Sequence, residues 1–234
     1  MEKLHHIGVI LDGNRRFAKR LMKQPWKGHE WGGKKVTEFL GWCKETDIRT
    51  ATLYSLSVQN FSRPKIEFEF LMKTFEKEFL EIANNKTHEA HKNKVNVRAV
   101  GRLWMLPESV QEAIKKAEQA TANYSDFHLN VAIAYGGQEE IVDAMTKIGE
   151  GIKTGKLQPS DIDEKLIKEN LYTGQPSPDL ILRTGGEERL SNFMTWQSAY
   201  SELAFTDKLW PELQKKDFFN IVKDFQMRER RFGR

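Results

Sequence analysis

Residues 5–20 read HHIGVILDGNRRFAKR, and this stretch determines how the rest of the chain is interpreted. An apolar run over residues 7–11 stops at Asp12, Gly13 and Asn14, and two arginines follow directly. A buried strand, a glycine turn and a basic helix start are typical of phosphate-binding pockets, because glycine admits a close backbone approach and a helix N-terminus offers free N–H groups. The stretch therefore predicts an anion site directly after the first strand.

The sequence that follows alternates between short β-branched segments and longer amphipathic ones. Strands separated by helices favour βαβ units and a mainly parallel sheet. We predict a single α/β domain over residues 1–234, with a central, mostly parallel sheet of about six strands surrounded by helices. The expected strands are 6–11, 50–56, 95–100, 127–134, 179–182 and, more weakly, 203–206; the expected helices are 30–45, 65–92, 107–122, 137–150 and 160–170.

Composition limits the class of protein. A chain of 234 residues with 39% hydrophobic content is long enough to bury a sizeable core. The single cysteine, Cys43, excludes an internal disulfide framework and favours a reducing compartment. The net charge of +4 is too small to indicate nucleic-acid binding. Neither a membrane-spanning run nor a signal-peptide pattern is visible, so we expect a cytoplasmic protein whose only membrane contact would be peripheral.

Polar and glycine-containing clusters follow four of the expected strands. Ligands of parallel sheets bind beyond the carboxyl ends of the strands, so these clusters are expected at one edge. Arginines gathered there would repel one another unless an anion lay between them, and guanidinium groups match phosphate oxygens. Together the clusters indicate a ligand with several negative charges, such as two diphosphates. The members are Asp12 to Arg16, then Ser57, Asn60 and Arg63, then Gly136 and Gly137, and finally Arg183, Gly185, Gly186, Arg189 and Ser191.

Asp12 would repel a phosphate unless a cation lay between the two groups. Mg²⁺ commonly takes one or two carboxylates together with phosphate oxygens, so Asp12 is the expected ligand and Glu202 a second one. An Asx-type turn or a helix cap remains an alternative role for Asp12. The P-loop pattern is absent, and Asn14 stands where an aspartyl-phosphate phosphatase needs a second aspartate, which disfavours both of those enzyme classes.

The long segment 65–92 carries apolar residues at spacings of three, four and seven, which predicts one apolar helix face. Such a face ordinarily belongs to the core. Beside a diphosphate site it also suits a channel for a hydrocarbon tail, and prenyl diphosphates combine such a tail with that head group. The residues of this face are Phe68, Leu71, Met72, Phe75, Phe79 and Ile82.

The motifs, in this order, resemble those of the cis-prenyltransferases, the family of undecaprenyl and dehydrodolichyl diphosphate synthases. The resemblance covers nearly the whole chain. It rests on HHIGVILDGNRRFAKR, GHEWGG, TLYSLSVQNFSRP, LNVAIAYGG, LILRTGGEERLSNFMTWQSAYSELAFTDKLWPE and the terminal RRFG. It implies a cis-polyprenyl diphosphate synthase, in which Mg²⁺ assists the condensation of isopentenyl diphosphate onto an allylic prenyl diphosphate primer.

The resemblance also implies residue roles. Asp12 and Glu202 would hold Mg²⁺, and Asn60 occupies the position linked to proton removal, where we expect it to position the substrate rather than act as a base. The tunnel for the growing chain would be lined by Phe68, Leu71 and Phe75. The allylic diphosphate would be bound by Gly13, Asn14, Arg15, Arg16, His29 and Arg63, with Phe17, Ser57 and Phe61 alongside; isopentenyl diphosphate would be bound by Arg183, Arg189 and Ser191, and by Arg231 and Gly233 from the tail of the partner in a homodimer.

The chain departs from the family pattern at three positions. Pro25 stands where many members have arginine, Gln59 where many have glutamate, and Phe61 where tryptophan is usual. Altered diphosphate contacts keep open an irregular coupling in which dimethylallyl diphosphate replaces isopentenyl diphosphate as acceptor. A non-catalytic partner subunit is a further alternative, which is less favoured because such subunits lose the aspartate and arginines that follow the first strand.

Overall fold

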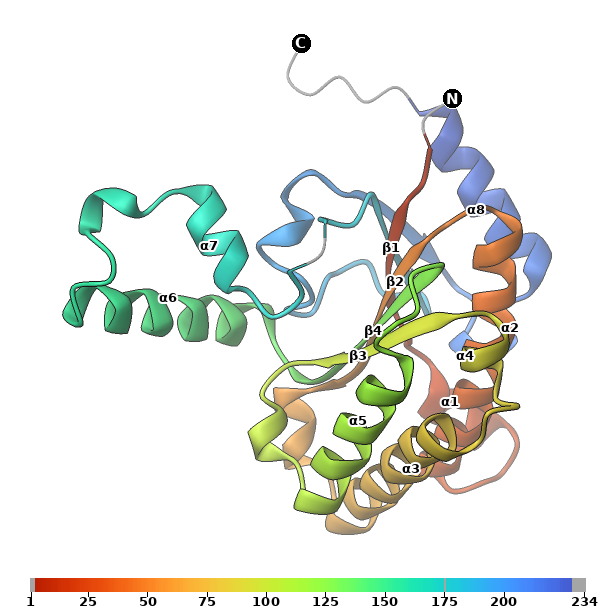
Figure 1. Ribbon diagram of the computed structural model, residues 1–234. Helices are drawn as coiled ribbons and strands as arrows, with labels where there is room; N and C mark the ends of the chain where they lie inside the picture. The colour runs from red at the N-terminus through yellow and green to blue at the C-terminus, as the bar shows by residue number, and fades with distance from the viewer. Residues whose placement is uncertain (1–2, 175, 229–234) are drawn as a thin grey trace.

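A computed structural model of the chain describes residues 3–174 and 176–228 (Figure 1). Its centre is one six-stranded sheet in the order β3-β4-β2-β1-β5-β6, in which every pairing is parallel. The predicted α/β fold and mostly parallel sheet are therefore confirmed. The strands are β1 His6–Ile10, β2 Thr50–Ser57, β3 Val95–Val100, β4 Phe127–Tyr135, β5 Leu180–Thr184 and β6 Glu202–Thr206.

The first strand lies in the middle of the sheet, between β2 and β5, and all five of its residues are buried. A parallel strand covered on both faces reads as a continuous apolar run rather than as an alternating one, which is the pattern of residues 7–11. Asp12 and Gly13 follow at the carboxyl edge. The opening stretch of the sequence therefore lies at the centre of the fold.

Eight α-helices connect or flank the strands in the described part of the chain. The short helix α1 and the last helix α8 were not among the expected segments, and α7 begins four residues later than predicted. Asp163 accounts for that start, because its Oδ1 accepts a hydrogen bond from the backbone N–H of Leu166 (2.7 Å) and caps the helix. The helices are α1 Asn14–Arg20, α2 Gly28–Glu45, α3 Lys65–Asn84, α4 Glu89–Lys92, α5 Glu108–Thr121, α6 Gly137–Lys153, α7 Glu164–Asn170 and α8 Lys215–Met227.

The expectation of one helix over 65–92 was wrong. Helix α3 ends at Asn84, and the Oδ1 of Asn85 accepts bonds from the N–H and hydroxyl of Thr87, at 2.9 and 2.7 Å. The Nδ1 of His88 then accepts from the N–H of Ala90 (3.1 Å) and caps α4. Asparagine competes for backbone hydrogen bonds in this way and breaks a helix where the apolar pattern alone would continue it.

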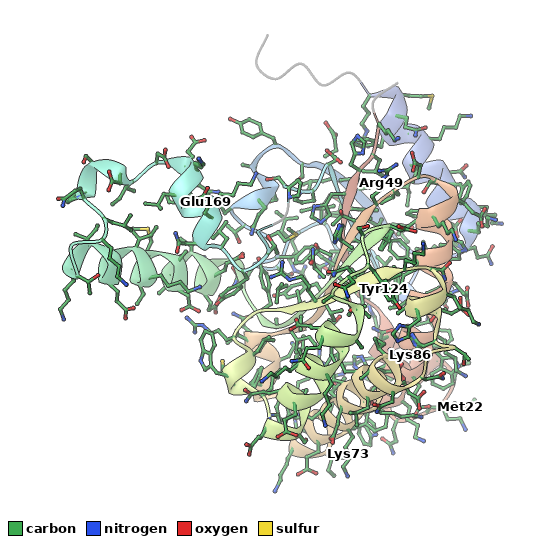
Figure 2. The ribbon with its side chains drawn as sticks, viewed as in Figure 1. Met22, Arg49, Lys73, Lys86, Tyr124 and Glu169 are labelled. Carbon is green, nitrogen blue, oxygen red and sulfur yellow. The ribbon has the colours of Figure 1, made fainter. Side chains whose placement is uncertain are left out.

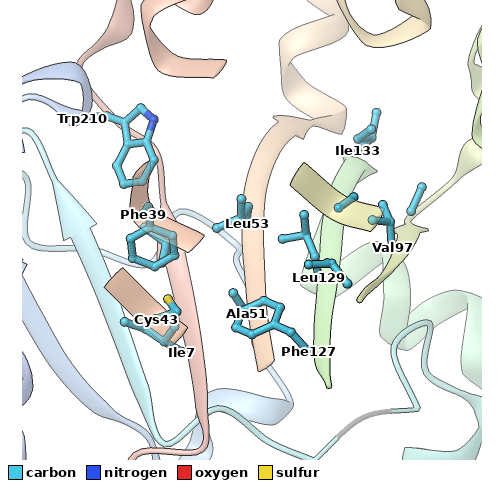
Figure 3. Packing of buried hydrophobic residues seen from close by; sticks show 14 of the residues in the cluster. Ile7, Phe39, Cys43, Ala51, Leu53, Val97, Phe127, Leu129, Ile133 and Trp210 are labelled. Atoms are coloured by element: carbon cyan, nitrogen blue, oxygen red, sulfur yellow. The ribbon is translucent and has the colours of Figure 1, made fainter. Parts of the chain in front are cut away.

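The main core lies between one face of the sheet and helices α2, α3, α5 and α8. Figure 3 shows Phe39 and Cys43 of α2 next to Ile7 of β1, with Leu53 and Leu129 on the neighbouring strands. A smaller cluster on the other face lies beneath the connection that follows β5. Helices α6 and α7 pack on each other and form an arm that extends away from the sheet (Figure 1). No helix of the described residues is long and apolar enough to cross a membrane.

Candidate active site

Asp12 is fixed at the carboxyl edge of β1 by both its backbone and its side chain. Its carbonyl oxygen accepts from the Oγ1 of Thr184 (2.8 Å) and from the N–H of Trp210 (2.9 Å). Its carboxylate accepts from Arg183 Nη2 at 2.9 Å and from Arg16 Nη2 at 3.2 Å. The side chain of Asp12 is 29% exposed and lines a large cavity, so the carboxylate is both held in place and accessible to a ligand.

Arg183 is the most buried cation of the site, with 5% of its side chain exposed at the end of β5. Besides Asp12, it donates from Nη1 to the carbonyl oxygen of Arg189 (2.5 Å) and to the Oγ of Ser191 (2.7 Å). Its Nε has no hydrogen-bond partner within the described residues. Gly185 makes the close approach of Arg16 possible, because a Cβ there would lie 2.5 Å from the Nη2 of that arginine.

A second cluster of cations surrounds Glu67, in the first turn of α3. Only 2% of this carboxylate side chain is exposed; Arg63 Nη1 donates to it at 3.0 Å, and Arg15 Nε lies 3.4 Å away. Arg63 Nη1 also lies 3.4 Å from the Nε2 of His29. Burial and the neighbouring arginines lower the pKa of His29 to about 4, so its ring is neutral at pH 7. Sequence reasoning missed Glu67, although its spacing of four from Arg63 was a usable signal.

The turn after β2 places Ser57 and Asn60 on the cavity wall. The Oδ1 of Asn60 accepts from the N–H of Ser57 (3.2 Å), which orients the carboxamide. Because an amide has no basic group at neutral pH, this arrangement suits the positioning role that was expected for Asn60.

Glu139 joins two loops of the site. Its carboxylate accepts from Gln59 Nε2 at 3.2 Å and from Asn192 Nδ2 at 2.7 Å. The Oδ1 of Asn192 accepts from the N–H of Gln138 (2.8 Å), so it caps α6 from another part of the chain. Ser191 and Asn192 both have left-handed backbones, at φ 50° and 65°. The bridge thus helps to hold an unfavourable loop conformation that positions Ser191.

The cavity has a volume of about 940 Å³ and lies between the sheet, α2 and α3. Its end near the carboxyl edge is polar, and its interior is apolar. This combination can accommodate an anionic head group together with a hydrocarbon chain. The polar end includes Asp12, His29, Asn60, Arg63, Arg183 and Ser191; the interior includes Leu40, Leu53, Leu71, Phe75, Phe79, Ile82, Leu129 and Val131.

A family model described as "Putative undecaprenyl diphosphate synthase" matches residues 10–233. The chain belongs to this prenyltransferase family. It is 51% identical, over 232 residues, to the tritrans,polycis-undecaprenyl-diphosphate synthase (geranylgeranyl-diphosphate specific) of Methanocaldococcus jannaschii, covering 98% of this chain and 82% of that protein. It is 50% identical to the Methanopyrus kandleri protein of the same name, over 98% of this chain and 84% of that one.

Two solved prenyltransferase-like structures share the fold. Lavandulyl diphosphate synthase from Lavandula x intermedia, in complex with dimethylallyl diphosphate, superposes with a TM-score of 0.92 at 35% identity, covering 99% of both chains. A probable undecaprenyl diphosphate synthase from Campylobacter jejuni superposes with a TM-score of 0.82 at 32% identity, covering all of both chains. The family resemblance inferred from the motifs is therefore confirmed.

Not every residue expected at the prenyltransferase site lies beside Asp12 in the structure. Glu202 begins β6 opposite Leu180, the first residue of β5, so it lies at the amino edge of the sheet and away from Asp12. It accepts instead from Arg228 Nη1 (2.7 Å). Glu202 starts a strand and Asp12 follows the end of another. In a parallel sheet these two positions lie at opposite edges, so a single chain does not bring the two expected metal ligands together. Arg231 and Gly233 lie outside the described residues.

Other expected contacts are indirect. Phe17 packs edge-to-face on Trp31, and Phe61 packs on Phe68 with ring centroids 5.0 Å apart; none of these rings is part of the cavity wall. Of the three expected tunnel residues, Leu71 and Phe75 line the cavity and Phe68 does not. Gly13 has a φ of 108° and lies against Leu209, so its role is in the turn itself.

Of the remaining expected positions, only Asn14 lines the cavity. Asn14 is buried and donates to the carbonyl oxygen of Leu11 (3.1 Å), while its Oδ1 has no partner among the described residues. Arg189 is exposed and pairs with Glu187, so only its carbonyl oxygen contacts Arg183. Pro25 begins a 3-10 turn; the nearby lysines, Lys23 and Lys27, do not line the cavity.

Proposed function

We propose that the chain is a cis-polyprenyl diphosphate synthase, which condenses isopentenyl diphosphate onto an allylic prenyl diphosphate. The observation that carries the proposal is the cavity with a cationic end and an apolar interior. The names of the relatives from Methanocaldococcus jannaschii and Methanopyrus kandleri support geranylgeranyl diphosphate as the primer and an undecaprenyl product.

The proposed reaction joins C1 of the allylic primer to C4 of isopentenyl diphosphate. The C1–O bond of the primer breaks, and its diphosphate leaves with the electron pair. A proton is lost from C2 of isopentenyl diphosphate as the new C2–C3 double bond forms, and a phosphate oxygen can accept that proton. Asn60 would hold the reacting groups in place. The main contribution of the protein would be electrostatic stabilisation of the departing diphosphate.

The two cation clusters would divide the diphosphates between them. Arg63, Arg15 and the neutral His29 would bind the primer, with Asn14 and Arg16 at the rim; Arg183 and Ser191 would bind isopentenyl diphosphate, with Arg189 reorienting from the surface. Asp12 fits Mg²⁺, because its carboxylate is partly exposed on the cavity wall beside both groups of arginines. The ion would supply neutralisation of the diphosphate charge.

The apolar interior would take up the growing chain. Leu71 and Phe75 on α3 face the cavity and would limit product length, because a larger side chain there shortens the space available. Phe68 would act only through its packing on Phe61.

We also propose a homodimer, in which the tail residues Arg231 and Gly233 complete the partner's site. Support comes from apolar side chains left in solvent on the turn before the edge strand β6, at Tyr200 (80% exposed), and on α6, at Val142 (58%) and Met145 (43%). We expect the protein to act in the cytoplasm, in peripheral contact with a membrane that receives the lipid product.

Irregular coupling with dimethylallyl diphosphate as acceptor is the second candidate function, favoured by the TM-score of 0.92 to the lavandulyl synthase. The higher identity to the undecaprenyl synthases favours regular coupling. A non-catalytic subunit is disfavoured, because Asp12 is retained on the cavity wall and pairs with Arg16 and Arg183.

The proposal is tested by incubating the purified protein with Mg²⁺, radiolabelled isopentenyl diphosphate and each allylic primer in turn. Products are dephosphorylated and sized by chromatography, with Asp12→Ala in parallel. A ladder of cis-polyprenols that depends on Asp12 supports the proposal and gives the chain length. Incorporation of dimethylallyl diphosphate alone would favour irregular coupling. If the pure protein makes no product from any pair, the homodimeric synthase is excluded.

A further inference from the structure

Met22 has an unusual position at the end of α1. The N–H of Lys23 bonds to the carbonyl oxygen of Ala18 (2.9 Å), and the N–H of Met22 bonds to that of Lys19 (3.0 Å). These two bonds form a Schellman motif, whose left-handed residue is usually glycine because a Cβ is unfavourable there. Here that residue is methionine, with φ 53°. Local stability therefore does not explain the choice of side chain.

The Met22 side chain has no packing role either, because 95% of it is exposed. Figure 2 shows it at the outer edge of the molecule, near the end at which α1 and α3 lie. Leu21 beside it is 45% exposed. Ile66, which is 65% exposed, lies on the first turn of α3, and this helix contacts the turn at residues 25–27. Apolar side chains are thus presented to solvent at a place where the backbone is strained.

The surrounding charge is positive. Lys19, Lys23 and Lys27 form no ion pair with any residue of the described chain, whereas Arg20 pairs with Glu212 at 2.9 Å. Glu30 is the acidic residue next to Met22 on this surface. Exposed apolar tips among unpaired lysines are typical of surfaces that insert into the headgroup region of anionic bilayers.

We propose that residues 19–27 dock the protein on a bilayer that contains anionic lipids, with Leu21 and Met22 inserted and the three lysines at the headgroups. This docking segment begins in the last turn of α1, the helix that starts two residues after Asp12 on the cavity wall. The inference rests on the proposed function, because a polyprenyl product has to pass from the cavity into lipid.

The test is sedimentation of the purified full chain with phosphatidylcholine vesicles, with and without phosphatidylglycerol. Met22→Gly removes the apolar side chain and relieves the left-handed backbone, so it should keep or raise the melting temperature while vesicle affinity falls about tenfold. Lys19→Gln, Lys23→Gln and Lys27→Gln together should abolish the preference for phosphatidylglycerol. Met227→Ser is the matched control: this methionine is 61% exposed on α8 and its loss should leave binding unchanged.

Unchanged binding of Met22→Gly, or an equal loss in Met227→Ser, would overturn the proposal. So would equal binding of the wild type to both kinds of vesicle. Turnover is measured separately, without vesicles. An active enzyme that does not sediment with vesicles would contradict only the docking segment, whereas a protein that binds vesicles but makes no product would contradict the proposed function.

Discussion

Two carboxylates organise the cations of the site, and they differ in one property. Asp12 lies between Arg16 and Arg183, and Glu67 lies between Arg15 and Arg63. In each group one arginine is about half exposed and the other is largely buried. The Asp12 side chain is 29% exposed and faces the cavity, whereas the Glu67 side chain is 2% exposed and does not line it.

The difference shows that the same set of charges can serve two purposes. A carboxylate that reaches the cavity can bind a cation and meet a diphosphate. A buried carboxylate can only hold its arginines, and it keeps their guanidinium groups from separating when no anion is bound. Burial, and not residue type, distinguishes a ligand-binding group from a positioning group here.

Loss of the accessible carboxylate should have the largest effect. Asp12→Asn keeps a hydrogen-bonding oxygen but removes the charge, so kcat/KM should fall by about 10³-fold or more while the protein remains folded. Steady-state kinetics and thermal unfolding measure the two outcomes. Asp207→Asn, at an exposed position after β6, is the control. Comparable losses in both variants would mean that access to the cavity does not set the role of Asp12.

Loss of the buried carboxylate should affect binding and stability together. In Glu67→Gln, Arg15 and Arg63 lose their shared anion, so the KM for the primer should rise about tenfold with a smaller change in kcat. The free energy of unfolding should fall by about 2 kcal/mol. Glu69→Gln, whose carboxylate is 54% exposed on the same helix, should change neither. A loss confined to kcat would give Glu67 a catalytic role and would contradict its assignment as a positioning group.

A third carboxylate, Glu139, accepts hydrogen bonds from two neutral amides instead of two cations. Its removal should therefore lower the activity less. Glu139→Ala should lower kcat/KM about fivefold by loosening the loop that carries Ser191. Because Gln59 donates to the same carboxylate, Gln59→Leu and Glu139→Ala should be non-additive in a double-mutant cycle. Additive effects would show that the bridge does not couple the two loops.

The smallest effect should be the pH dependence contributed by His29. Its pKa is about 4 in the folded chain, against the ordinary histidine value of 6.5, so the unfolded chain binds more protons between these values. Stability should therefore fall as the pH is lowered from about 6.5 to about 4, and His29→Gln should flatten this part of the curve. Burial also lowers the pKa of His6 to about 4, so this histidine should account for the pH dependence that remains in the His29→Gln variant. Melting temperatures across this range, measured without ligand, check the difference; an unchanged curve contradicts it.

Much of the fold and of the site follows from local sequence. Short apolar, β-branched segments predicted all six strands within a few residues, and their separation by helices favoured parallel pairing. Asp12, Asn60, Arg63, Arg183 and Ser191 were all predicted from their positions after strands, because the carboxyl ends of parallel strands meet at one edge. The family followed from the order of the motifs.

Only the tertiary structure decided which charges are buried and which side chains reach the cavity. Glu67 becomes a positioning group because α1 brings Arg15 to the first turn of α3, and Glu202 is separated from Asp12 because it starts a strand whose other end lies at the site. Phe68 and Leu71 share one apolar pattern, yet only Leu71 lines the cavity. Periodicity specifies the face of an element, whereas exposure and contact depend on what other elements bring to that face.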